Sequence, residues 1–126
     1  MKSKILLLAL IFVALTSCNK HETTTKEYLC TVTQTGESNP SVTVLKNDVG
    51  AIVWTRTAKG VYSGVLNNAF PDKTKVSIVV GQNMINVDIL SAVINENTIQ
   101  LITKETGESV IDGKLLNTTL EIKIFQ

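Results

Sequence analysis

The chain has 126 residues, which is enough for one domain and not comfortably for two. Its 12 basic and 11 acidic side chains give a formal net charge of +1. This near balance is no footprint for DNA, RNA or an anionic lipid surface, all of which need a clustered basic surface. We therefore expect no nucleic-acid partner.

The first residues have the pattern of a secretory signal peptide. Lys2 and Lys4 precede the apolar run ILLLALIFVAL at 5–15, and small residues follow it. A membrane-spanning helix needs about 20 apolar residues, so this run is too short to cross a bilayer. The alternative is a buried core helix, which fits poorly with a position at the N-terminus and a polar successor. We expect residues 1–17 to be cleaved off.

Residues 15–18 read LTSC and resemble the lipobox of bacterial lipoproteins, with Leu15 third before the cysteine and Ser17 directly before it. The resemblance implies that a diacylglycerol is attached to the thiol of Cys18. It also implies cleavage between Ser17 and Cys18 and acylation of the new amine, for example with palmitate. Two or three acyl chains would anchor the protein stably, since each buried methylene contributes about 0.8 kcal/mol. The alternative is an ordinary signal peptide with Cys18 as an incidental thiol.

The segment NKHETTTKE at 19–27 has no aliphatic or aromatic side chain. We interpret residues 18–27 as the lipidated cysteine and a polar tether, which spans at most about 30 Å when extended. Asn19 rather than aspartate follows Cys18, so by resemblance to enterobacterial sorting rules the outer membrane is favoured over the inner one. The tether also resembles those of Bacteroidota lipoproteins, some of which face outward, so the leaflet stays open.

From 28 to 126 the sequence reads as short β-strands separated by turns. In TTLEIKIF, Leu120, Ile122 and Ile124 alternate with polar residues, as in a strand with one buried face. MINVDIL, TKVSIVV and NTIQLIT alternate in the same way, and the first predicts that Ile85, Val87 and Ile89 share a face. Turn residues recur at a spacing of about eight to twelve residues, which favours consecutive antiparallel hairpins.

This pattern predicts an all-β domain over 28–126, and we favour a small antiparallel meander that closes into a barrel. A β-sandwich is the alternative. The stretch GVYSG at 60–64 resembles glycine-containing strands of lipocalin-like barrels. That likeness covers five residues and supports bent strands more than ligand binding.

Side chains that carry chemistry are sparse. His21, the single histidine, lies in the expected tether, which is a poor place for a catalytic base or a zinc ligand. With Cys18 lipidated, Cys30 has no disulfide partner, and its alternating surroundings favour a buried thiol over a reactive one. Asp88 and Glu121 read as ordinary surface carboxylates rather than a glycosidase pair. We expect no enzymatic activity, no cofactor and no metal.

Aromatic side chains give the candidate ligand surface, which consists of Trp54, Tyr62 and Phe70. Trp54 and Tyr62 could pair across the hairpin that turns at 59–60, and Phe70 lies in the longest predicted connection. The alternative is that all three pack in the core or plug one end of the barrel. The sequence thus predicts a lipid-anchored cell-envelope protein that binds a small ligand or a protein partner. A structural subunit of an envelope assembly and an inhibitor of lysozyme-like enzymes are the alternatives.

Overall fold

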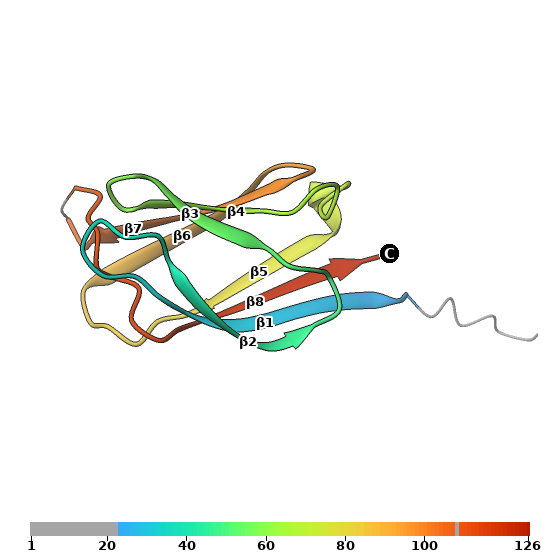
Figure 1. Ribbon diagram of the computed structural model, residues 1–126, viewed down its shortest axis with the longest axis horizontal. Helices are drawn as coiled ribbons and strands as arrows, with labels where there is room; N and C mark the ends of the chain where they lie inside the picture. The colour runs from blue at the N-terminus through green and yellow to red at the C-terminus, as the bar shows by residue number, and fades with distance from the viewer. Residues whose placement is uncertain (1–22, 108) are drawn as a thin grey trace, which may run out of the picture.

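The computed structural model describes residues 23–107 and 109–126, which form two packed antiparallel sheets (Figure 1). Each sheet has four strands. Sheet A has the order β2 (Ser41–Asn47), β1 (Thr25–Thr33), β8 (Thr118–Phe125), β5 (Val76–Gly81). Sheet B has the order β3 (Val53–Ala58), β4 (Val61–Val65), β7 (Thr98–Glu105), β6 (Val87–Asn95). One short 3₁₀ turn, η1 (Lys73–Lys75), precedes β5. The all-β prediction is confirmed.

The prediction of a meander that closes into a barrel is wrong, because the strands form two separate sheets. Only β1–β2, β3–β4 and β6–β7 pair as neighbours in sequence, whereas β8 pairs with β1 and β5, and β4 pairs with β7. The chain crosses to the other layer after β2, β4, β5 and β7, so the two sheets stay separate. The arrangement fits the sandwich alternative. A period-two pattern specifies which face of a strand is buried but not which strand lies beside it.

The domain begins earlier than the sequence predicted. β1 starts at Thr25, so residues 25–27 belong to sheet A and not to a tether. These residues pair with 123–125 of β8. Polar side chains did not prevent this, because the ladder is made by backbone groups and the side chains at the strand end are largely exposed. The expected signal peptide, Ser17, Cys18 and His21 lie outside the described residues.

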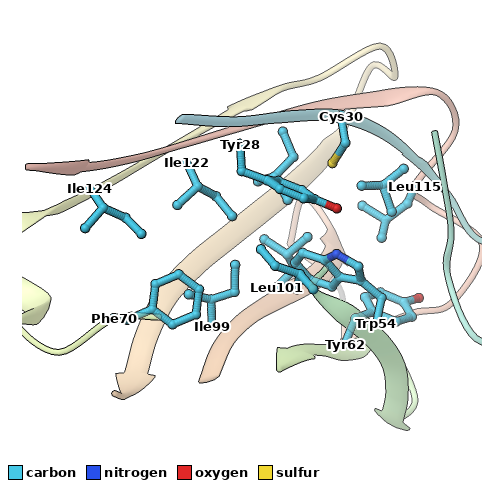
Figure 2. Packing of buried hydrophobic residues seen from close by; sticks show 13 residues of the cluster. Tyr28, Cys30, Trp54, Tyr62, Phe70, Ile99, Leu101, Leu115, Ile122 and Ile124 are labelled. Atoms are coloured by element: carbon cyan, nitrogen blue, oxygen red, sulfur yellow. The ribbon is translucent and has the colours of Figure 1, made fainter. Parts of the chain in front are cut away.

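The core lies between the two sheets and follows the alternation read from the sequence. Leu120, Ile122 and Ile124 of β8 are buried, and so are Ile99 and Leu101 of β7 (Figure 2). β6, however, begins at Val87, and Ile85 is 90% exposed in the preceding loop, so its predicted place on a buried strand face is wrong.

The first strand and the last strand meet at one end of the sandwich. β1 begins and β8 finishes there, at the right of Figure 1, beside the connection between β4 and β5. We call this the terminal end. The turn at 59–60 and the segment 109–117 lie at the opposite end.

Candidate functional site

The three aromatic residues predicted as a ligand surface are all in the core. Trp54 is 6% exposed, Tyr62 0% and Phe70 1%, so they form no exposed patch and the alternative of core packing holds. Figure 2 shows Trp54 and Tyr62 facing Tyr28 and Cys30 of the other sheet. Large aromatic rings gain most from full burial, which is how this chain uses them.

Trp54 and Tyr62 also do not lie directly opposite each other across the β3–β4 hairpin. Trp54 lies opposite Gly64, and Tyr62 lies opposite Arg56, so the two aromatic residues are diagonal neighbours across the hairpin. A Cβ atom at Gly64 would lie 2.8 Å from Cζ2 of the Trp54 indole. The second glycine of GVYSG therefore makes room for a core side chain, and it is not a sign of a barrel.

A part-buried polar cluster lies at the end opposite the terminal end. The Asp112 carboxylate accepts hydrogen bonds from Arg56 Nε (3.0 Å), Arg56 Nη2 (2.8 Å) and the Gly60 N–H (2.7 Å). The Tyr62 hydroxyl lies 2.9 Å from Gln34 Oε1 and 3.2 Å from Asp112 Oδ1. The hydrogen bonds from Arg56 lower the pKa of Asp112 to about 2, against the opposing effect of burial. These hydrogen bonds join β3, the turn at 59–60 and the segment 109–117.

Cys30 is a free cysteine whose thiol is buried. Cys30 is 0% exposed, and desolvation of the thiolate raises the pKa of Cys30 to about 11. A thiol that stays protonated is a poor nucleophile and a poor metal ligand. The prediction of a buried thiol is confirmed.

A pocket of about 390 Å³ opens at the terminal end and is the strongest candidate site in the described residues. We call it the end pocket. Its size falls within the range of about 300–1,000 Å³ typical of small-molecule sites. Apolar side chains supply most of its surface: Val49, Leu66, Ala69, Pro71, Ile124 and Phe125.

Residues of β1 and β8 build one wall of the end pocket. Lys26 of β1 and Val76 of β5 both lie opposite Ile124 of β8, so the three share the core-facing side of sheet A at its last row. Tyr28, two residues after Lys26 on the same face, is buried. Lys26 therefore lies at the solvent-exposed edge of the apolar face of sheet A.

The connection between β4 and β5 builds the other wall and is fixed in place by the β6–β7 turn. The Leu66 N–H donates to the Asn97 carbonyl (2.9 Å), and the Phe70 N–H donates to the Glu96 carbonyl (2.8 Å). The Asn68 N–H donates to Asn97 Oδ1 (2.6 Å). Phe70 anchors this connection in the core near Ile99 (Figure 2). The wall is thus held by backbone hydrogen bonds and by one buried ring.

Polar groups line the rim of the end pocket. Lys26, Lys75 and Asp72 are its charged side chains, and Asn67, Asn68 and Gln126 add amides. The Asp72 carboxylate caps η1 by accepting from the Thr74 N–H (2.9 Å) and hydroxyl (2.6 Å), and these bonds lower the pKa of Asp72. Within the described ranges, Lys26 and Lys75 have no salt-bridge partner.

Sequence reasoning missed this site because its residues come from both ends of the domain and from the 66–75 connection. The one usable signal was the NNAFPDK stretch, which was correctly identified as a long connection. Nothing in the local pattern showed that it folds back over the end of β8.

A second exposed feature is the outer face of sheet B. Val53 and Val65 lie opposite each other on this face and are 62% and 41% exposed, and Leu90 on β6 is 52% exposed. Neither pocket described for the domain is lined by Val53, Val65 or Leu90, so we treat this face as the rival surface for apolar ligands.

Comparison with protein-family models, curated proteins and solved structures finds no match to this chain. Within residues 23–107 and 109–126, no helix has the length and hydropathy to span a membrane. The same ranges contain no group of three or more His, Cys, Asp or Glu side chains that could hold a metal ion.

Proposed function

We propose that this chain is a lipid-anchored binding protein of the cell envelope, non-enzymatic, that holds a small, partly apolar molecule in the end pocket. The observation that carries the binding part is the pocket itself: about 390 Å³, with apolar walls and a polar rim, between elements fixed by backbone hydrogen bonds. Such a site buries an apolar ligand body and orients it with a few polar contacts.

The anchoring part rests on the LTSC motif and on the position of the pocket. Lys26 lines the end pocket and lies eight residues after Cys18. Eight residues span at most about 27 Å. If Cys18 carries acyl chains, the end pocket is therefore tethered close to the membrane surface, which is the natural source of partly apolar ligands. The outer membrane remains the favoured destination, on the resemblance to sorting rules given above.

The anchor is tested by expressing the full chain in bacteria with radiolabelled palmitate. Wild type is expected to incorporate the label and Cys18→Ala is not. Intact mass measurement of the purified protein is expected to give a chain that begins at Cys18 and carries added acyl mass. Equal labelling of both forms, or an unmodified N-terminus elsewhere, contradicts the anchor.

Ligand binding is tested in membranes that contain the full chain, with a photoactivatable diazirine analogue of dodecanol. After irradiation and proteolysis, mass spectrometry is expected to find the label on peptides that carry residues 66–75 or 118–126. Ala69→Trp fills the end pocket and is expected to reduce this labelling severalfold. Ala58→Trp, an exposed position at the opposite end, is the matched control.

A second variant guards against misfolding of the first. Asn67→Trp places the ring at the exposed rim, where it obstructs the mouth without entering the core. Circular dichroism establishes that each variant is folded. Binding at the end pocket is contradicted if folded variants label as wild type does, or if the label lies on the outer face of sheet B.

A further inference from the structure

We infer that the end pocket selects an anionic single-chain amphiphile, with the apolar chain inside and the negative head group between Lys26 and Lys75. This inference rests on the proposed function and names the ligand class for the same site. It follows from the size of the end pocket, from the position of the two lysines and from the excess of positive over negative side chains in its lining.

The size of the end pocket limits the apolar part of the ligand to one short chain. At roughly 30 Å³ per non-hydrogen atom, the share of volume that a water molecule takes in the liquid, 390 Å³ holds about a dozen such atoms. That matches a chain of about ten to twelve carbons and excludes both chains of a diacyl lipid. Ile124, Leu66 and Val49 supply apolar contacts along it.

The two lysines flank the end of β8 from opposite sides. Lys26 lies on β1, which pairs with β8 on one side. Lys75 ends η1, directly before β5, which pairs with β8 on the other side. Both side chains line the end pocket at its rim. Both lysines are exposed, so we place the head group of a buried chain between them.

The charge of the rim favours an anion. Two ammonium groups face one carboxylate among the charged side chains of the lining. That carboxylate, Asp72, accepts two hydrogen bonds from Thr74 as the cap of η1, and the charged side chains of the lining retain one positive charge in excess. In the described part of the chain neither lysine has a salt-bridge partner; Lys59, Lys73 and Lys104 have none either, but they do not line the end pocket. An anionic head group would supply the missing partner.

The test compares three photoactivatable diazirine probes with the same twelve-carbon chain: a carboxylic acid, an alcohol and an amine. Each is titrated into membranes that contain the full chain, and labelling of peptides with residues 66–75 or 118–126 is measured. The acid is expected to label at several-fold lower concentration than the alcohol, and the amine at higher concentration. An exposed ion pair typically changes affinity about two- to fivefold, and the preference should weaken as salt increases.

Variants assign the preference to the two lysines. Lys26→Gln and Lys75→Gln are each expected to reduce the acid-to-alcohol preference about two- to fivefold, because labelling by the acid falls more than labelling by the alcohol. Lys75→Glu should reverse the order, so that the amine labels better than the acid. Lys59→Gln, at the exposed turn of the opposite end, is the matched control and should change nothing.

Two sources could supply an anionic head group, a free fatty acid or an anionic phospholipid. A diazirine-bearing phosphatidylglycerol is the fourth probe, and it is expected to label the end pocket less than the free acid because only one of its chains fits. Stronger labelling by the phospholipid overturns the single-chain assignment. If the alcohol labels the end pocket as well as the acid in every variant, the anion selectivity is wrong and the proposed function stands. If no probe labels the end pocket, the proposed function fails with it.

Discussion

The polar cluster around Asp112 makes a quantitative prediction about stability and pH. The hydrogen bonds from Arg56 hold the pKa of Asp112 at about 2, below its ordinary value of 3.8. At about 1.4 kcal/mol per pKa unit, that gap corresponds to roughly 2 kcal/mol of folding free energy. The Asp112 side chain is 14% exposed, so solvent screens the interaction only in part. We expect Asp112→Asn to lower the free energy of unfolding by about 2 kcal/mol at pH 7.

The sign of the pH dependence follows from the direction of the pKa change. Because the folded-state pKa is depressed, the contribution is complete well above pH 4 and is lost as pH falls towards 2. The difference between wild type and Asp112→Asn should therefore shrink to about half its neutral value near pH 3. Urea unfolding followed by fluorescence measures this difference, since Trp54 is the single tryptophan and is buried.

Asp48→Asn is the matched control, because Asp48 is exposed and lies 3.6 Å from Lys46. It should change stability by less than about 0.5 kcal/mol. A difference for Asp112→Asn that is as small as this control, or that stays constant from pH 7 to pH 3, would refute the assignment of Asp112 as the part-buried anion of the cluster.

Three further predictions concern the core. Gly64→Ala should destabilise the protein by about 1–3 kcal/mol in urea unfolding, because the new Cβ would meet the Trp54 ring. Gly81→Ala should cost less, since its new Cβ would lie 3.2 Å from Thr119 Cβ, and equal effects of the two substitutions would contradict the packing of the indole over Gly64. The Cys30 thiol should resist a thiol-reactive disulfide reagent at pH 8 until the protein unfolds, and fast reaction of the folded protein would show that the thiol is not buried. Phe70→Ala should cost about 3–5 kcal/mol, measured by urea unfolding, and a loss below about 1 kcal/mol would mean that this ring does not anchor the 66–75 connection.

Local periodicity predicted the parts of the fold that depend on one strand at a time. The alternation in TTLEIKIF identified the buried face of β8, and the turn predicted at 59–60 is confirmed. Strand pairing was not predictable in the same way, since β8 finds its partners β1 and β5 far away in sequence. The strand expected to include Ile85 does not form there, because Asn86 adopts a positive φ of 60° that interrupts it.

The sites show the same limit. Asp112 precedes Gly113, a pair that is typical of turns, and its guanidinium partner lies 56 residues earlier in the chain. The end pocket combines Lys26, the 66–75 connection and the end of β8, so only the three-dimensional arrangement brings its walls together. Trp54, Tyr62 and Phe70 were candidates for a ligand surface because aromatic side chains often form such surfaces. In the structure all three fill the hydrophobic core instead.

The most direct test of the account is an experimental structure of the protein with dodecanoate. The account predicts the alkyl chain inside the end pocket, against Ile124 and Leu66, with the carboxylate within hydrogen-bond reach of Lys26 or Lys75. An end pocket that stays empty while dodecanoate binds the outer face of sheet B would contradict it.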